Sequence, residues 1–384
     1  MNEMAKMTLV GDIVIPPDDV VFNCNFFGRV FGNLEAPVCS EKKSRRPKAG
    51  PYLTSCPIPS IFQGGVVSLA NNHAMDYGDE GLQDTMLACQ SLNIATVGAG
   101  KTLKVARRPL IFKIGNVRVG VLARCEAQFG TATLWRCGVA ALDTKIYADI
   151  SHLKSEVDVV IVSIHGSAEM SPWPSPQWQS LLRSFIDAGA TVVHGHHAHV
   201  PQGYEEYHNG LIFYGLGNFI ADPRRWKNIP NTLWSVMSNI VFSQKGIQEY
   251  HVKTVTIKSG EKVEICESTQ EESIYHKQYL AKACSCLSNE KLLGGLWQEM
   301  SIRLYNKWYA PWLGFKAKTV LHRLKGYIQK TFNPRYHNLL QYHLFACDSH
   351  RDAIATALGL LSGELDDLRT DETKTLVNEM APGL

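Results

Sequence analysis

The chain has 384 residues, of which 45% are hydrophobic and 20% are charged. This composition is typical of globular proteins and excludes a disordered or collagen-like chain. At roughly 150 residues per domain, the length predicts two domains or three. The formal net charge is only +3, so the overall charge gives no reason to expect a nucleic-acid-binding protein.

Hydropathy and cysteine spacing indicate the cellular compartment. No run of about 18 consecutive apolar residues occurs, so no membrane-spanning helix is expected. The segment Met1–Val14 lacks the long apolar core of a signal peptide. The ten cysteines form no Cys-x-x-Cys pair, which favours reduced thiols over a disulfide framework or a zinc knuckle. Together these features predict a cytoplasmic protein.

Strands and helices alternate through the first two thirds of the chain. Helical periodicity predicts helices over Asp79–Leu92 and Gln177–Ala188, and Gly115-Asn116 predicts a hairpin turn. The pattern predicts an α/β fold with a mixed sheet, or two stacked sheets, covered by helices. Apolar runs predict strands at Thr8–Ile15, Gly65–Ala70, Leu110–Ile114, Val117–Leu122, Val157–Ile164, Thr191–His194, Leu211–Tyr214, Ser235–Phe242 and His251–Ile257.

The pattern becomes helical near residue 265, which divides the chain into an α/β domain (1–265) and a helical extension (266–384). Residues 281–340 carry ten Lys and Arg against two Glu, with aromatic residues interleaved. Two interpretations stay open for this extension. It packs its aromatic residues on the sandwich, or residues 290–335 contact an anionic membrane surface or a polymer synthase.

Polar side chains follow the apolar strands where the strands end, which is where sites form in layered α/β folds. Each one alone is a weak signal, because a strand-end Asp or His is usually structural. As a set they offer mixed oxygen and nitrogen ligands, which suit one or two divalent transition metals (Mn²⁺, Fe or Zn²⁺) and do not suit Ca²⁺. The set comprises two carboxylates, an amide and several imidazoles, at Asp12, Glu35, Asn72, His165, His197 and His199.

Residues 8–222 resemble the CapA family of capsule-biosynthesis proteins (poly-γ-glutamate synthesis proteins), a branch of the calcineurin-like metallophosphoesterases. The resemblance implies a four-layer αββα sandwich with a metal site at the strand ends. It is carried by GDI (11–13), GNLEAPV (32–38), SLANNHAMDYGDEGLQDT (68–85), VGAG (97–100), HGSAE (165–169), PSPQWQ (174–179), DAGATVVHGHHAHVPQG (187–203) and GLGNFIAD (215–222).

The resemblance also implies roles for single residues. Glu35 would bridge two metal ions, and His73 would face the substrate and assist the leaving group. Asp76 either orients His73 or caps the following helix. His196 is interpreted as a neighbour of the ligands. The implied metal ligands are Asp12, Glu35, Asn72, His165, His197 and His199, and the implied supporting or substrate-facing residues are Asn71, Glu169 and Asn218.

Two positions depart from the pattern. The wider superfamily has Asp-x-His in its first motif, whereas Val14 occupies the histidine position here. The first metal site is therefore left with Asp12, Glu35 and His199, while the second site is complete. The family's His-Trp-Gly is His165-Gly166-Ser167 in this chain, which removes a bulky side chain from the expected pocket.

These observations predict a metal-dependent hydrolase of capsule, exopolysaccharide or poly-γ-glutamate biosynthesis that acts on a phosphoester or an anionic polymer intermediate. The alternative is a non-catalytic metal-binding assembly subunit of a membrane polymer synthase. The basic loop Lys42–Lys48 either attracts an anionic substrate or is simply solvated. The expected location is cytoplasmic, with peripheral attachment to the inner face of the membrane as a hypothesis, and no nucleic-acid partner is expected.

Overall fold

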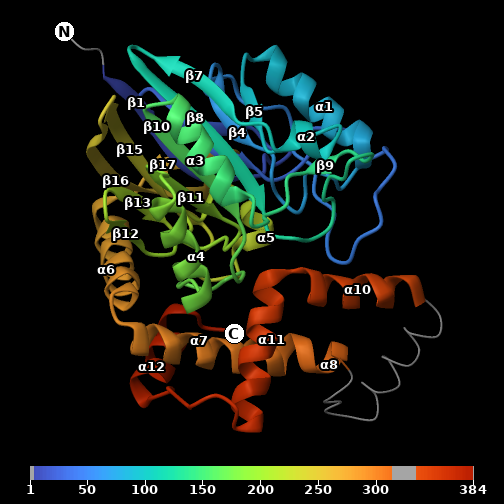
Figure 1. Cartoon of the computed structure of the whole chain (residues 1–384), viewed down its shortest axis with the longest axis vertical. Helices are drawn as coiled ribbons and strands as arrows, with labels where there is room; N and C mark the ends of the chain where they lie inside the picture. Colours follow the sequence, from blue (N-terminus) through green and yellow to red (C-terminus); the bar gives the residue numbers. More distant parts are fainter. Residues whose placement is uncertain (1–3, 314–333, 384) are drawn as a thin grey trace.

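The computed structural model describes residues 4–313 and 334–383. Its centre is two stacked β-sheets (Figure 1). The first sheet has nine strands in the order β2-β17-β16-β15-β1-β3-β4-β5, with β14 also paired to β1. Its strands are β1 (Ala5–Ile13), β2 (Val20–Asn23), β3 (Arg29–Leu34), β4 (Val66–Ser68), β5 (Ala95–Val97), β14 (Asn218–Ile220), β15 (Trp234–Ser243), β16 (Gly246–Ser259) and β17 (Val263–Glu267).

The second sheet has six strands in the order β12-β13-β11-β10-β8-β7. Its four central strands are parallel, and an antiparallel hairpin closes each edge. Gly115 supplies the positive φ of 55° that the β7–β8 turn needs. The strands are β7 (Leu110–Ile114), β8 (Val117–Cys125), β10 (Val159–His165), β11 (Val192–His196), β12 (Tyr204–Tyr207) and β13 (Gly210–Phe213), and a separate small hairpin pairs β6 (Ala99–Gly100) with β9 (Gly138–Val139).

Helices cover the outer faces of both sheets. Alternate residues of β10 point to opposite sides, so Ile161 belongs to the core between the sheets while Val160 and Val162 pack under α3 (Ile146–Glu156) and α4 (Pro176–Asp187). Helix α1 (Gly78–Ser91) covers the first sheet through residues such as Leu82. The predicted α/β sandwich of αββα type is therefore confirmed. Two short helices, α2 (Leu103–Ala106) and α5 (Pro223–Trp226), and a 3₁₀ turn at Ser60–Phe62 lie in the connections.

Strand direction and register assemble one edge of the sandwich. β1, β3 and β4 are parallel to one another in the first sheet, as are β8, β10 and β11 in the second, so their carboxyl ends meet on the same side. The register places Asp12 beside both Asn33 and Asn218, and it places His165 beside His196. Residues that are far apart in the sequence are thereby held at one edge.

Beyond β17 the described chain is helical. The first of these helices runs along the side of the sandwich beside β12, and the later ones lie against that same edge (Figure 1). Trp297 is buried among them and donates a hydrogen bond from Nε1 to Thr356, whereas Trp308 and Trp312 are exposed. Residues 314–333 of the predicted 290–335 contact lie outside the described residues, so that contact stays a prediction. The helices are α6 (Gln270–Leu287), α7 (Glu290–Leu304), α8 (Ala310–Leu313), α10 (Pro334–Ala346), α11 (Asp348–Ser362) and α12 (Asp371–Met380), with a π-helical segment at Tyr305–Tyr309.

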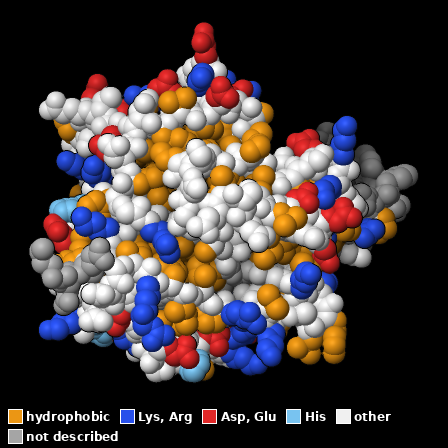
Figure 2. Space-filling model, turned by 90° about the horizontal axis from the view of Figure 1, so that it is seen from above, with side chains coloured by type: hydrophobic (Ala, Val, Ile, Leu, Met, Phe, Trp, Pro, Cys, Tyr) orange, Lys and Arg blue, Asp and Glu red, His pale blue; other side chains and the backbone are white. Residues whose placement is uncertain are grey.

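The opposite end of the sandwich is seen in Figure 2, where side chains of both charge signs lie among hydrophobic ones. This mixed surface agrees with the small net charge of the chain. Within residues 4–313 and 334–383, no helix has the length and apolar character that a membrane span requires.

Candidate metal centre

Five of the six predicted ligands form overlapping clusters at the strand ends. Asp12, Glu35 and His199 form one cluster, and Glu35, His165 and His197 form another. Within each cluster the candidate ligand atoms lie within 4.8 Å of one another. Glu35 belongs to both clusters, which is the arrangement that a carboxylate bridging two ions requires.

The Glu35 carboxylate shows that the centre suits a cation. It follows β3, is fully buried, and neither of its oxygens has a hydrogen-bond partner among the described residues. Burial, reinforced by the charge of Asp12, raises the pKa of the Glu35 carboxyl well above its usual range. A buried carboxylate without partners is costly. Divalent ions held by Glu35 and the surrounding imidazoles would remove that cost, so the residues present fit the divalent metals expected from the sequence.

His165 is oriented by two amides. Asn33 Nδ2 lies 3.2 Å from His165 Nδ1 and 2.8 Å from Asp12 Oδ1. His165 Nε2 then faces Asn72 Oδ1 at 3.0 Å and lies 3.6 Å from Glu35 Oε1. Asn72, the sixth predicted ligand, thus directs its oxygen to the same point as His165 Nε2 and Glu35. Three atoms of the types that bind transition metals converge there.

His199 is oriented in the same way from the other side. Its Nδ1 lies 3.0 Å from Asn218 Oδ1 and donates to it, which leaves the Nε2 lone pair toward Glu35 Oε1, 3.7 Å away. Asn218 donates in turn to the Thr232 carbonyl. Its position is that of a residue that orients a ligand histidine, an arrangement common around protein metal sites. The ring of Trp226 packs on His199, with centroids 4.8 Å apart.

The segment after β11 departs from ordinary backbone geometry. His197 has φ 92° and His199 has φ 59°, in the left-handed region that side-chain-bearing residues rarely adopt. The His197 amide donates to Asp12 Oδ2 at 3.2 Å. Such strain costs about 1–3 kcal/mol per residue and concentrates at functional sites. Here it turns two imidazoles into the centre within three residues.

His196 and Glu126 lie closer to the centre than the sequence suggests. His196 Nδ1 is 3.2 Å from Asp12 Oδ1, without hydrogen-bond geometry. Burial alone would raise the pKa of the Asp12 carboxyl. The interaction with His196 outweighs burial and lowers this pKa to about 2. Glu126 follows β8, its carboxylate lies 3.7 Å from His197 Nε2, and burial raises its pKa to about 7. Glu169 stands at the rim, half-exposed, 3.9 Å from the same His197 atom.

A buried triad stands beside the metal centre. His73 Nδ1 lies 2.8 Å from Asp76 Oδ2 and 3.0 Å from Lys48 Nζ, and Lys48 forms an ion pair with Asp76. Asp76 also accepts the backbone amide of Leu53. Helix α1 has Tyr77 at its N-cap position, so Asp76 contacts His73 and does not cap the helix. Burial, followed by the charge of Lys48, lowers the pKa of His73 to about 4, so His73 is neutral near pH 7.

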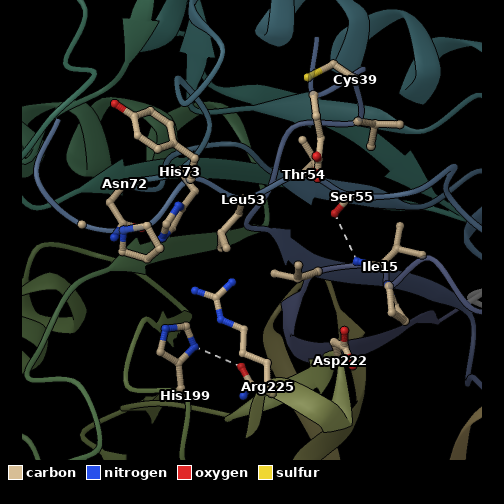
Figure 3. A pocket seen from close by; sticks show the side chains of 18 of the residues that line it. Ile15, Cys39, Leu53, Thr54, Ser55, Asn72, His73, His199, Asp222 and Arg225 are labelled. Atoms are coloured by element: carbon tan, nitrogen blue, oxygen red, sulfur yellow. Dashed lines mark hydrogen bonds between the residues drawn. The ribbon is translucent and has the colours of Figure 1, made fainter. Parts of the chain in front are cut away.

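The centre opens into a cavity of about 820 Å³. Figure 3 shows four side chains directed into it: Asn72 and His73 from one turn, His199 and Arg225 from two other segments. Lys48 and Arg225 supply positive charge to its wall, and both favour the ionised form of Glu35. Such a wall suits an anionic substrate.

The remaining predicted positions lie at the surface, behind the centre or along the cavity. In the basic loop, Lys43 pairs with Asp84 on α1, and only Lys48 is buried at the cavity. Asn71 lies behind the centre, where it donates to the Leu34 carbonyl and accepts the amides of the turn that follows it. Val14 lines the cavity without a donor atom, so the first cluster keeps the three protein ligands expected for it.

Sequence reasoning missed Glu126 and Arg225 as parts of this site and named Lys48 only as one residue of the basic loop. The predicted strand ended at Leu122, whereas β8 continues to Cys125 and delivers Glu126. Arg124 hides this extension, because an arginine normally ends an apolar strand. Here it is buried and paired with Asp149. A search for strand-end carboxylates that tolerates one paired charge would have found Glu126.

Residues 28–223 match a family model described as "bacterial capsule synthesis protein PGA_cap". The chain belongs to this family. The predicted membership is confirmed, and two CapA proteins show the same relationship. The chain is 28% identical to the capsule biosynthesis protein CapA of Bacillus anthracis over 79% of this chain and 77% of that protein. It is 34% identical to the PGA biosynthesis protein CapA of Bacillus subtilis over 50% of this chain, a match that spans about half (53%) of the relative.

Solved structures show weaker similarity to this PGA_cap protein. A hypothetical protein from Thermus thermophilus gives a TM-score of 0.39 at 14% identity, covering 65% of this chain and 98% of that one. A 5'-nucleotidase from Candida albicans gives 0.31 at 12% identity, covering 63% and 43%. At these scores the description of the fold rests on its own sheets and helices.

Proposed function

We propose that this PGA_cap protein is a metal-dependent hydrolase that acts on a phosphoester or on an anionic polymer intermediate of capsule or poly-γ-glutamate synthesis. One observation carries the proposal. Glu35, buried and without a hydrogen-bond partner in the described part of the chain, is shared by two clusters of metal-ligand side chains beside a cavity lined by Lys48 and Arg225.

Each group of residues in the site has its own role. Divalent ions, when bound, supply Lewis acidity and a water of lowered pKa. Asp12, Glu35, Asn72, His165, His197 and His199 hold the ions. Lys48 and Arg225 bind the negative charge of the substrate, and Asn33 and Asn218 keep the ligand imidazoles in one orientation.

His73 is neutral near pH 7, so it must take up a proton before it can assist the leaving group. A carboxylate oxygen only accepts, so the contact of Asp76 Oδ2 with Nδ1 places the proton of the neutral ring on Nδ1 and leaves the lone pair on Nε2. Once Nε2 has taken up a proton, the ring passes it to the leaving oxygen, and Asp76 stabilises the charged ring in between. Asp76 also holds Lys48 through its other oxygen. Acid–base transfer by positioned groups of this kind contributes typically 10²–10⁴-fold to rate.

The alternative, a non-catalytic metal-binding assembly subunit of a membrane polymer synthase, is favoured by one observation. Val14 leaves the first cluster with three protein ligands, so a bound ion there has a structural or ligand-binding role in this alternative. The presence of the His73–Asp76–Lys48 triad, which no structural ion requires, favours the enzyme.

The test combines metal analysis with turnover. The full chain, purified without chelator, is analysed for metal and assayed with aryl phosphomonoesters and phosphodiesters in added Mn²⁺. We expect bound transition metal and metal-dependent turnover. His165→Ala should lose metal, while His73→Gln should keep it and lose about 10²-fold or more in rate. His251→Gln, a change at an exposed histidine of β16, is the matched control. A wild-type protein without metal, or a His73→Gln variant with full activity, would contradict the enzyme.

A further inference from the structure

A second group of metal-ligand side chains lies outside the centre described above. His343 is on α10, Cys347 joins α10 to α11, and His350 is in the first turn of α11. Figure 1 shows the two helices meeting at a corner. One donor atom from each residue lies within 4.8 Å of the other two. The corner therefore presents two imidazoles and a thiol to one point.

The imidazoles are arranged as ligands. Gln128 Oε1 can only accept, so His343 donates to it from Nε2 at 3.1 Å and keeps the lone pair on Nδ1. The His350 Nδ1 atom is buried and has no hydrogen-bond partner among the described residues. The two rings lie 4.6 Å apart between centroids. Burial is the main reason that the pKa of His343 is lowered to about 3 and the pKa of His350 to about 4. Both rings are therefore neutral near pH 7, as metal ligands must be.

The thiol needs the ion in order to ionise. Cys347 is fully buried at the N-cap position of α11, and burial, reinforced by the charge of Glu126, raises the pKa of its thiol well above the usual range. A bound ion would displace the thiol proton. Cys347 Sγ lies 3.2 Å from Ser349 Oγ. Ser349 donates from its amide and its hydroxyl to the two oxygens of Glu126. Through Ser349 the corner is connected to Glu126, which lies beside His197 of the first centre.

We propose that His343, Cys347 and His350 bind a single Zn²⁺ ion. A set of two nitrogens and one sulfur suits Zn²⁺ and does not suit Mg²⁺, Ca²⁺ or Mn²⁺, which prefer oxygen. Three protein ligands leave a fourth position for water or another exchangeable ligand. The site is distinct in chemistry from the first centre, whose candidate ligands include no sulfur.

The ion would fix the helical extension over the cavity. His343 lines that cavity and packs against Phe129, with ring centroids 5.0 Å apart. Zn²⁺ at the corner would join α10 to α11 and hold His343 and Ser349 against Gln128 and Glu126 of the sandwich. This inference does not depend on the proposed hydrolase activity.

Cobalt provides a readout that the first centre cannot give. The full chain is stripped of metal and titrated with Co²⁺, and the thiolate-to-cobalt charge-transfer absorption in the near ultraviolet is followed. We expect one equivalent of this absorption in the wild type, its loss in Cys347→Ala, and its displacement by Zn²⁺. Cys125→Ala removes the buried thiol next to Glu126 and is the matched control, which should keep the band. Metal analysis should show one Zn²⁺ fewer per chain in Cys347→Ala.

A second variant decides the outcome if Cys347→Ala does not fold. His343 is only partly buried, and His343→Gln should keep the fold while weakening Zn²⁺ binding about 10-fold or more. The absence of a thiolate band in the folded wild type would overturn the proposal. So would a band that persists in Cys347→Ala, or one that keeps its intensity and Zn²⁺ affinity in His343→Gln.

Discussion

The ammonium nitrogen of Lys48 lies 3.0 Å from Nδ1 of His73, and both side chains are buried beside the metal centre. Lys48 comes from a basic loop in which Lys43 pairs with Asp84 and Arg46 donates to the Cys137 carbonyl. The contact is stable only because Asp76 stands between the two groups and interacts with each. A buried cation therefore adjoins a histidine that is held neutral.

This triad predicts strong energetic coupling between Lys48 and Asp76. Lys48→Met leaves the Asp76 carboxylate buried without its cation, and Asp76→Asn leaves the ammonium without its anion. Each change should destabilise the protein by about 3–5 kcal/mol. The double variant should be less destabilised than the sum by at least about 1 kcal/mol. Urea unfolding measures all three, and Lys42→Met, an exposed position of the same loop, should change stability by less than about 0.5 kcal/mol. Additive effects would show that the ion pair carries no coupling.

The unpartnered Glu35 carboxylate predicts opposite effects with and without metal. Its pKa in the folded state is raised, so the stability of the metal-free protein falls as pH increases above the ordinary carboxyl pKa of about 4.3. Glu35→Gln should remove this loss and stabilise the metal-free protein by about 1–2 kcal/mol at pH 8. It should also abolish most of the stabilisation that added Mn²⁺ gives the wild type. Thermal unfolding with chelator or Mn²⁺ tests both expectations. Glu264→Gln, at an exposed position of β17, is the control, and equal Mn²⁺ stabilisation of Glu35→Gln and wild type would exclude Glu35 as a ligand.

The positive φ of 92° at His197 predicts a difference between two variants that both remove the imidazole. Glycine adopts such a conformation readily, whereas in alanine the Cβ clashes with the backbone and destabilises the conformation by about 1–2 kcal/mol. In chelator, His197→Gly should therefore be more stable than His197→Ala by about 1 kcal/mol or more. Ala198 provides the control, because its φ is not positive. At this position the order should be reversed, so the wild type with its native alanine should be more stable than Ala198→Gly. Equal stabilities of the two His197 variants would mean that the loop relaxes when the imidazole is removed.

His276 predicts a pH dependence of stability that is unrelated to metal. It is buried, stacks on Trp234 with ring centroids 4.0 Å apart, and bonds to Ser268. Burial lowers its pKa to about 4, below the unfolded value of about 6.5. Because the unfolded chain takes up the proton first, this contribution to stability is present above pH 6.5 and falls as pH decreases toward 4. Between pH 7.5 and 5 the loss is about 2 kcal/mol.

The comparison of variants isolates this contribution from those of the other histidines. Urea unfolding of His276→Gln at the two pH values should show a decrease in stability about 2 kcal/mol smaller than in the wild type. The exposed His251, which pairs with Glu249, provides the control, since His251→Gln should reproduce the wild-type pH dependence. A pH dependence of His276→Gln equal to that of the wild type would show that the ring is protonated in the folded protein.

The sequence by itself determined the layered α/β sandwich, because this follows from local patterns, and it predicted the candidate ligands from strand ends and family motifs. Apolar runs such as Val157–Ile164 need a sheet covered on both faces, and Asp12, Glu35 and His165 follow such runs directly. Parallel strands then bring those ends to one edge without further information. Family motifs gave the order in which the ligands occur along the chain.

Only the tertiary structure decided which residues surround those ligands. Lys48 reaches His73 because a loop folds back over the cavity, and Glu126 reaches His197 because β8 continues through the buried Arg124. The corner at Cys347 lies near the centre because the helical extension packs against one particular edge of the sandwich. Such contacts depend on packing between separate segments of the chain, which for Ser349 and Glu126 lie more than 200 residues apart, and no periodicity or spacing within either segment encodes them.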